Sequence, residues 1–137
     1  MSEFISLKKY FLEELNIKAP LHSIPENILN VEMSTNLSFG KNKSADNLYM
    51  VTLSCSVNYK EIPEYKINAK INGIFETGKK CINDDMRDRL LSNGAASTLY
   101  GALREVIRAV TCSTIYPPLI LPIIHFEEKK ISFEDEQ

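Results

Sequence analysis

The sequence has few cysteines, no long apolar run and almost no net charge, and each absence excludes a class of protein. Cys55, Cys81 and Cys112 are odd in number and far apart, which argues against a disulfide framework or a zinc site. A formal net charge of -2 does not supply the basic face of a general nucleic-acid binder. No apolar run approaches the roughly 18 residues of a membrane span, and the N-terminus does not resemble a signal peptide. We therefore expect a cytoplasmic protein with reduced thiols, no nucleic-acid partner and no membrane insertion.

The catalytic motifs with strong sequence signatures are also missing. The chain has no nucleophile elbow, zinc-protease motif, P-loop or dinucleotide-binding glycine pattern. Asp84, Asp85 and Asp88 fit the solvated first turn of a helix better than a metal cluster. Glu13 and Glu14 are neighbours in a predicted strand, so they should point to opposite faces and form no acid-base pair. We expect no enzymatic activity, no metal and no cofactor.

Four segments are predicted to be strands. In the first, Phe4 to Ala19, the apolar residues sit mostly on odd positions, and a bulge or bend near Lys8 and Lys9 is expected to change the face. The next three alternate apolar and polar residues, with a polar turn from 40 to 46 and a link containing Pro63; they cover about 31–39, 49–59 and 65–75. One apolar and one polar face indicate an antiparallel sheet whose apolar face needs a cover.

Two helices near the C-terminus are predicted to provide that cover. Asn83 is the expected N-cap of a short helix, and Asn93-Gly94 should end it or hinge it to the next. A long helix from about Ala96 to Cys112 carries an apolar stripe at helical spacing, formed by Leu99, Leu103, Val106, Ile107 and Val110. The sequence therefore predicts one α+β domain over residues 1–137, a four-stranded antiparallel sheet with both helices on one face, followed by a charged, solvated tail over about 127–137.

The segment between the long helix and the tail is apolar but interrupted by prolines. Pro117, Pro118 and Pro122 exclude a helix interior or a central strand, so the segment should be extended. Two interpretations remain open for its large apolar residues. In the first, they close the bottom of the core. In the second, they line an oligomer interface or a groove for apolar segments of another chain, together with whichever of Leu48, Met50 and Ile74 are exposed.

At these residues the chain resembles the SecB-type export chaperones. FISLKKYFLEELNIKAP, residues 4–20, resembles the first strand of that family, and INGIFETG, residues 71–78, resembles the end of its fourth strand. The most specific match is LYGALREVIRAV followed by YPPLILPIIHF, which resembles the long helix of the family and the double-proline break after it. The resemblance runs in order from about Phe4 to Phe126.

The resemblance implies a SecB-like fold and an ATP-independent holdase that keeps unfolded or precursor polypeptides from aggregating. Subunits would pair through their first strands into a dimer, and the dimers would join by helix packing into a tetramer. Carried onto this chain, the client-binding residues would be Ile74, Phe75, Tyr116, Leu119 and Leu121. On this interpretation Leu119→Asp or Tyr116→Ser should weaken client binding and leave the melting temperature nearly unchanged.

The sequence also departs from the family where the SecA motor would dock. Family members that hand cargo to this motor present carboxylates on the polar face of the sheet, whereas this chain has Lys18, Asn68 and Lys70 there, with Glu14 as the main acid. Little sequence follows Phe126, so we expect the C-terminal helix and motor-binding tail of the family to be largely missing. The resemblance therefore supports the fold and the chaperone role more than docking on SecA. Two alternatives stay open: a dedicated chaperone of one client such as an antitoxin, and a small-ligand-binding domain or enzyme with a closed pocket sealed by residues 117–122.

Overall fold

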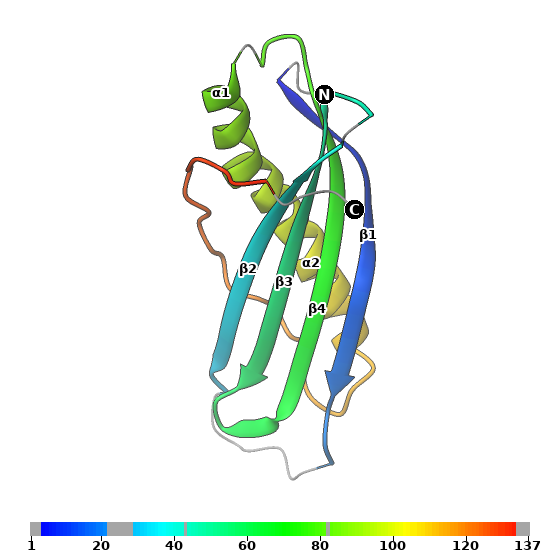
Figure 1. Ribbon diagram of the computed structural model, residues 1–137. Helices are drawn as coiled ribbons and strands as arrows, with labels where there is room; N and C mark the ends of the chain where they lie inside the picture. The colour runs from blue at the N-terminus through cyan, green and yellow to red at the C-terminus, as the bar shows by residue number, and fades with distance from the viewer. Residues whose placement is uncertain (1–3, 22–28, 43, 82, 134–137) are drawn as a thin grey trace.

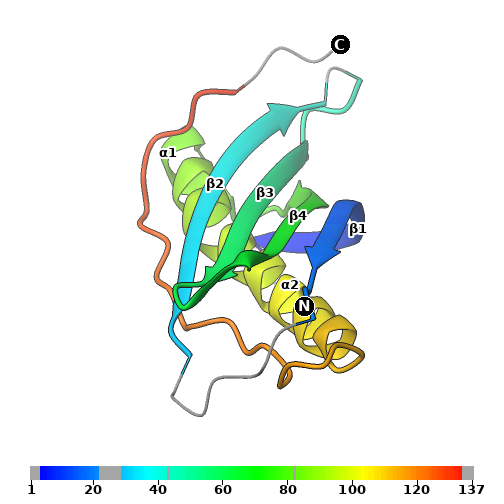
Figure 2. The same cartoon turned by 90° about the horizontal axis from the view of Figure 1, so that it is seen from below.

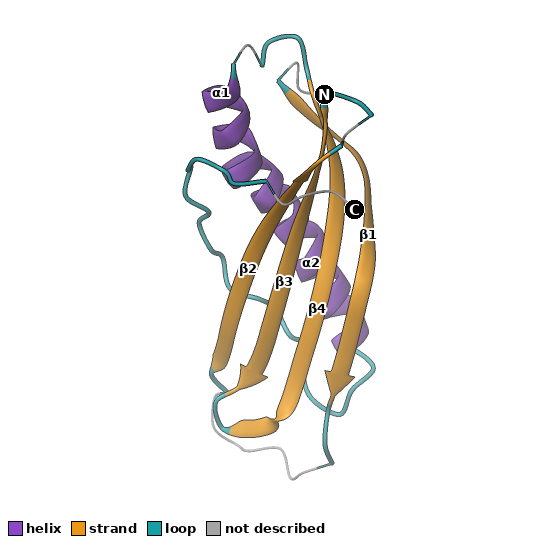
Figure 3. Cartoon of the chain, viewed as in Figure 1, coloured by secondary structure: helices purple, strands orange, loops and turns teal. Residues whose placement is uncertain are grey.

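The computed structural model describes residues 4–21, 29–42, 44–81 and 83–133, and it has two layers (Figure 1). One layer is an antiparallel sheet in the order β1-β4-β3-β2. The other is a nearly continuous helical rod, which crosses behind the sheet (Figures 1 and 2). The elements along the chain are β1 (Ile5–Lys18), β2 (Val31–Lys41), β3 (Leu48–Tyr59), β4 (Ile62–Thr77), α1 (Asp84–Arg89), the π-helical segment η1 (Leu90–Ala95) and α2 (Ala96–Thr111). The four strands and the C-terminal helices are those predicted, as Figure 3 shows.

The sheet has one apolar face and one polar face. The apolar residues of β3 and β4 are almost fully enclosed, and Leu53, Ile67 and Ile71 are each 0% exposed. β2 pairs with β3 over its full length without an irregularity. β1 pairs with β4 through two register shifts, between Leu7 and Lys9 and between Leu12 and Glu14. The bulge predicted near Lys8 and Lys9 is therefore confirmed, and the second one was not foreseen.

Local interactions determine where the helical layer begins and why it continues from α1 into α2. The Asn83 side chain accepts a hydrogen bond from the Met86 backbone N–H at 2.8 Å, which confirms the predicted N-cap. Asn93 and Gly94 do not end the helix, because they lie inside the π-helical turn that joins α1 to α2. The residues that α2 buries are Ala96, Leu99, Tyr100, Leu103, Ile107 and Thr111. Val110, which we had placed on the buried stripe, is 37% exposed, because the contact face is rotated toward Tyr100 and Thr111.

Gly73 explains how closely the helix approaches β4. A Cβ atom at this position would lie 2.7 Å from Leu99 Cδ2 and 2.8 Å from the Phe75 ring. Real carbon contacts do not become so short, so a side chain at Gly73 would push α2 away from the sheet.

One strand boundary differs from the prediction. β4 begins at Ile62, so Pro63 is its second residue rather than part of a link. The pairing shifts at this point, since Tyr59 pairs with Ile62 but Asn58 pairs with Lys66. Proline is tolerated at the start of a strand and beside an irregularity, because the missing N–H costs no regular ladder bond there.

Candidate functional site

The C-terminal segment, residues 119–133, which we call the strap, runs in an extended form along the helical layer. Side chains of the helices hold its backbone at intervals. Thr111 Oγ1 accepts from the Leu119 N–H at 2.8 Å, Arg104 donates to the Leu121 carbonyl at 3.0 Å, and Ser92 Oγ accepts from the Lys129 N–H at 3.0 Å. Further bonds of this kind join Tyr100 to Pro122, Asn93 to Phe126 and Asp88 to Ile131. The prolines and the regularly placed hydrogen bonds together account for the extended shape.

Side chains of the strap divide between the core and the solvent. Leu119, Leu121 and Phe126 are buried against the helices and the sheet. Ile120 and Ile123, which lie between them in the sequence, are 65% and 88% exposed. The interpretation that the segment closes the core therefore holds for Leu119, Leu121 and Phe126, whereas Ile120 and Ile123 are left accessible to another chain. An extended chain turns successive side chains in different directions, which accounts for this division. Because their neighbours are held in the core, these two isoleucines stay on the surface and expose apolar area to the solvent.

An aromatic cluster fixes the start of this surface. The Tyr65 ring centroid lies 4.7 Å from that of Tyr59 and 4.9 Å from that of Tyr116. The Tyr116 hydroxyl donates to the Pro20 carbonyl at 2.7 Å, which ties the end of β1 to the segment after α2. Burial, with a smaller effect of the neighbouring Tyr59, raises the pKa of Tyr65 to about 12. The three rings form a structural corner at one end of the sheet.

The five predicted client-binding residues are mostly enclosed in the single subunit. Phe75, Tyr116 and Leu119 are 2%, 3% and 2% exposed, and Leu121 is 0% exposed. Only Ile74 is partly exposed. The expectation that Leu119→Asp or Tyr116→Ser would leave the melting temperature unchanged is therefore wrong, because both substitutions remove core contacts. The exposed neighbours Ile120 and Ile123 offer the better probe of this surface.

Those five residues also do not form one patch. Tyr116 contacts Tyr65 near the start of β4, and Phe75 lies ten positions further along the strand, about 33 Å away in extended geometry. Ile74 is the neighbour of Phe75 and therefore points to the opposite face of the sheet, where its register partner on β3 is the exposed Met50. The structure thus separates an apolar region at the strap from another at the far end of β4.

Two apolar residues near the end of the described chain, Ile131 and Phe133, are anchored on the core. The Arg87 guanidinium lies over the Phe133 ring at 4.8 Å from its centroid and over the Tyr49 ring at 5.6 Å. Arg87 also pairs with Asp88 at 2.9 Å, and Asp88 accepts a hydrogen bond from the Ile131 N–H at 3.2 Å. The charged side chains at 127–130 are exposed, as predicted for a solvated tail. Ile131 and Phe133 depart from that prediction, because they are partly buried against the core.

Two grooves border the edges of the sheet. The larger, about 470 Å³, follows the first residues of β1, with Phe75 as a contact and Gly94, Ala95 and Thr98 on the helical side. The second, about 320 Å³, lies between β2 and the strap and is lined by Thr35, Asn36, Leu37, Ser92, His125, Phe126, Glu127 and Lys129. None of the residues from 117 to 122 lines either groove, so neither is the sealed pocket that a ligand-binding domain would require.

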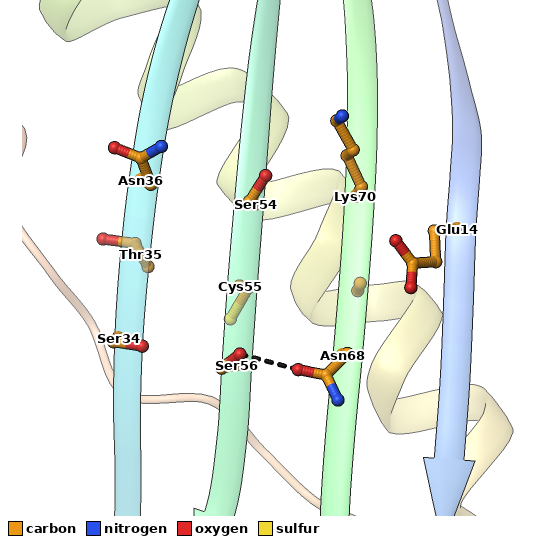
Figure 4. A pocket seen from close by; sticks show the side chains of 10 residues that line it. Glu14, Ser34, Thr35, Asn36, Ser54, Cys55, Ser56, Asn68 and Lys70 are labelled. Atoms are coloured by element: carbon orange, nitrogen blue, oxygen red, sulfur yellow. Dashed lines mark hydrogen bonds between the residues drawn. The ribbon is translucent and has the colours of Figure 1, made fainter.

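A third, shallow groove of about 260 Å³ lies on the polar face of the sheet, where hydroxyl, amide and charged side chains gather (Figure 4). Ser56 donates to Asn68 Oδ1 at 2.7 Å. Glu13 pairs with Lys70 at 3.1 Å and accepts from the Asn72 amide at 2.8 Å. These two hydrogen bonds, from Asn72 first and from Lys70 second, lower the pKa of Glu13. Lys70 therefore offsets one of the carboxylates that stand on this face.

The second bulge of β1 corrects our interpretation of Glu13 and Glu14. Glu14 lines the polar groove beside Lys70, and Glu13 reaches Lys70 and Asn72 on the same face. Strict alternation would have placed them on opposite faces. The register shift between Leu12 and Glu14 inserts an extra residue and brings both carboxylates to the polar side. Strict alternation alone therefore does not identify Glu13 as a member of this face.

Exposed apolar residues of β1 were also missed. Tyr10, Phe11 and Leu12 are 49%, 37% and 40% exposed, although they occupy the middle of a long strand. α2 packs mainly on β3 and β4. The β1 residues Ile5, Leu7, Leu15 and Ile17 are only partly buried against the core. The sequence signal for this surface was the run of apolar residues at consecutive positions in a long first strand. Such a strand is apolar on both faces, and at the edge of a sheet its outer face needs a cover from another surface.

Across residues 4–21, 29–42, 44–81 and 83–133, no three His, Cys, Asp or Glu side chains gather closely enough to hold a metal ion. Within the same ranges no helix has both the length and the apolar character needed to cross a membrane.

Comparison with known proteins decides the family. Residues 2–130 match the family model described as preprotein translocase subunit SecB. The chain belongs to the SecB family. The protein-export protein SecB of Anaplasma marginale strain Florida is 31% identical over 110 residues, which cover 79% of this chain and 62% of that protein. The chain thus spans a little under two thirds of the length of this relative.

Two further relatives agree. The protein-export protein SecB of Psychrobacter arcticus is 26% identical over 126 residues, covering 90% of this chain and 84% of that protein. A solved structure of a Mycobacterium tuberculosis SecB-like chaperone, in complex with a ChAD peptide from an antitoxin, superimposes with a TM-score of 0.74 at 14% identity. The match covers 88% of this chain and 91% of that one, and it shows that the two share a fold. The predicted SecB-like fold and family are confirmed.

Proposed function

We propose that this SecB-family chain is an ATP-independent holdase that binds unfolded or precursor polypeptides in the cytoplasm. The observation that carries the proposal is the strap, which fixes Ile120 and Ile123 at 65% and 88% exposure between buried neighbours. A surface of this kind binds apolar segments without reading a particular sequence. Family membership and the names of the protein-export relatives support the same role. The proposal assigns the chain no catalytic step, because a holdase acts by binding alone.

The test measures aggregation of a chemically unfolded model substrate at stoichiometric ratios without nucleotide. The wild type should suppress aggregation, and the double variant Ile120→Ser/Ile123→Ser should suppress it several-fold less while its melting temperature stays within a few degrees. Leu121→Ser is the matched control, because Leu121 is 0% exposed and its loss should instead cost about 2–5 kcal/mol of stability. Absence of suppression by the wild type at several-fold excess would reject the proposal.

We further propose that β1 pairs with β1 of a second copy, and that dimers join through their helices. The exposed Tyr10, Phe11 and Leu12 on an edge strand support this pairing, since they would be covered in such a dimer. Mass measurement in solution tests the assembly. A monomer at all concentrations would contradict it.

We propose a second candidate function, that of a dedicated chaperone of one client such as an antitoxin. The charges of the polar face favour this role over that of a subunit that docks on SecA. Lys70 is paired with Glu13, and Lys18 and Lys66 face each other across β1 and β4. A face of this charge offers little attraction to a basic docking surface. Purified SecA should therefore bind the wild type weakly, with little dependence on salt. Tight binding that falls steeply with ionic strength would favour the export role.

A further inference from the structure

We propose that α1 and residues 127–133 form one hinged flap, which opens from the sheet about the π-helical segment η1 and is closed by a latch of Arg87 and Phe133 on Tyr49. The inference concerns a movement of the subunit and does not depend on the proposed holdase function.

Different helices hold the two halves of the strap. The first half is bonded to side chains of α2. Lys129 and Ile131 are bonded instead to Ser92 of η1 at 3.0 Å and to Asp88 of α1 at 3.2 Å. Over the described part of the chain, no hydrogen bond holds residues 123–125, which lie between the two halves. The strap can therefore move in two parts.

Phe126 marks the place where the moving part begins. Its carbonyl accepts from the Asn93 amide of η1, and its ring centroid lies 5.8 Å from that of Tyr100 on α2. The Phe126 side chain is buried. Only the residues after Phe126 therefore follow α1.

α1 adds little apolar packing to the subunit. It packs chiefly on η1 and lies at the end of the helical layer, beside the last part of the strap (Figures 1 and 2). Asp88 is the only buried residue of this helix, and it is polar. A helix of six residues is too short to be stable by itself. α1 therefore depends on its contacts with the strap and the sheet.

η1 is placed to serve as the hinge. Leu91 and Ser92 are each 0% exposed, so this segment stays in the core. Its π-helical hydrogen bonds interrupt the α-helical pattern between α1 and α2. Such interruptions are local irregularities of a helix and are found often at functional sites. A fixed segment with a weakly packed helix before it allows α1 to swing while α2 remains on the sheet.

One carboxylate joins the two parts of the flap. Asp88 Oδ1 pairs with the Arg87 guanidinium at 2.9 Å, and Asp88 Oδ2 accepts from the Ile131 N–H at 3.2 Å. The Arg87 and Asp88 side chains are 12% and 11% exposed, so solvent screens this pair only weakly. α1 and the end of the strap should therefore move together rather than separately.

The latch is a stack of one guanidinium and two rings. Arg87 lies 4.8 Å from the Phe133 ring centroid and 5.6 Å from that of Tyr49, and the two centroids are 5.5 Å apart. Tyr49 belongs to β3, and its hydroxyl donates to the Asp46 carbonyl at 3.1 Å. This bond keeps Tyr49 on the sheet when the flap opens.

Opening would uncover aromatic surface that the closed subunit hides. Tyr49 is 5% exposed, and Ile131 and Phe133 are partly buried against the core. Moving elements are drawn from the least stable parts of a fold, which have few buried apolar contacts. The latch, rather than the core between sheet and α2, therefore sets how much of this apolar surface is offered.

The first experiment measures amide hydrogen exchange by NMR in the free protein. Phe133→Ser removes one ring of the latch. The Ile131 amide and the Arg87 amide at the start of α1 should then exchange about fivefold to tenfold faster, by the same factor. The Leu119 amide, which is bonded to α2, should not change. Ser132→Ala is the matched control, because Ser132 is an exposed neighbour, and it should exchange like the wild type.

Three outcomes of this experiment would overturn the inference. Faster exchange at Ile131 with an unchanged Arg87 amide would mean that the strap opens without α1. Unchanged exchange at both would mean that Phe133 closes nothing. Equal acceleration at Leu119 would mean that the strap loosens as a whole, with no division between its halves.

The second experiment uses the lack of tryptophan in the chain. Phe133→Trp places a single fluorescent reporter on the latch. Adding Arg87→Met should make this reporter about twofold more sensitive to acrylamide quenching and shift its emission to the red, because the flap then opens more often. The melting temperature should fall by only a few degrees, since α2 and the sheet stay packed. Arg108→Met is the matched control, because Arg108 lies on α2 and pairs with the exposed Glu105. Unchanged quenching in the Arg87→Met protein would overturn the inference.

Discussion

The two faces of the sheet follow the same strands but meet different surroundings. The apolar face lies against α2, and Leu53, Ile67 and Leu103 at this contact are each 0% exposed. The polar face carries Ser54, Ser56 and Asn68 and is open to solvent (Figure 4). The difference shows that one face determines the stability of the subunit, whereas the other is free to vary in charge without loss of the fold.

The largest effect is expected from a carboxylate placed on the covered face. Leu103→Asp removes a side chain that is 0% exposed and buries an unpaired charge, which should cost on the order of 5 kcal/mol or more and unfold the domain. Ser54→Asp places the same group on the polar face and should change stability by less than about 1 kcal/mol. Thermal melts followed by circular dichroism compare the two. A cooperatively melting Leu103→Asp protein would show that α2 does not cover the sheet through this residue.

A smaller effect is expected where the helix approaches the covered face most closely. Gly73→Ala would place a methyl group 2.7 Å from Leu99 Cδ2, and relief of that clash should cost about 1–3 kcal/mol. Gly101→Ala is the matched control, because a Cβ atom there meets nothing within 4 Å. It should stabilise α2 by roughly 0.5–1 kcal/mol through helix propensity. Denaturant unfolding measures both, and equal stabilities would mean that the close contact at Gly73 is absent.

The smallest effect is expected on the polar face. The lowered pKa of Glu13 means that its carboxylate stabilises the fold above the ordinary carboxyl pKa, and that this contribution is lost as the pH falls through the lowered value. Glu13→Gln should therefore lose a small part of its stability at neutral pH and show a weaker decline in acid. Glu14→Gln should behave like the wild type, since no described residue pairs with Glu14. Melting temperatures between neutral and acidic pH test this, and identical profiles for wild type and Glu13→Gln would contradict it.

Much of the fold was predictable because it depends on local periodicity. The alternation in β3 and β4 predicted which residues are enclosed, and Asn83 predicted the start of α1. The burial of Tyr100 and Thr111 in place of Val110 was not predictable, since the face that α2 buries depends on surfaces from distant parts of the chain. The placement of Glu13 beside Glu14 on the polar face was also missed, because a bulge reverses the alternation and leaves no mark of its own in the sequence.

The candidate site was predictable only as a segment. The prolines showed that residues 116–126 are extended and apolar, and the resemblance to the SecB family pointed to the same segment. Which of its side chains face solvent depends on hydrogen bonds to distant residues, such as that of Arg104 to the Leu121 carbonyl. An extended chain has no fixed rotation of its own, so the direction of Ile120 and Ile123 follows from these anchors.

The sequence by itself determined the elements, the two-faced sheet and the family, because alternation, capping and proline act within a few residues. Only the tertiary structure decided which apolar residues are left over and which edge of the sheet is open. Tyr116 and Leu119 are enclosed while Ile123 is exposed, although all three have similar apolar character. The reason is that burial is a property of the surfaces that meet, and those surfaces come from parts of the chain far apart in sequence.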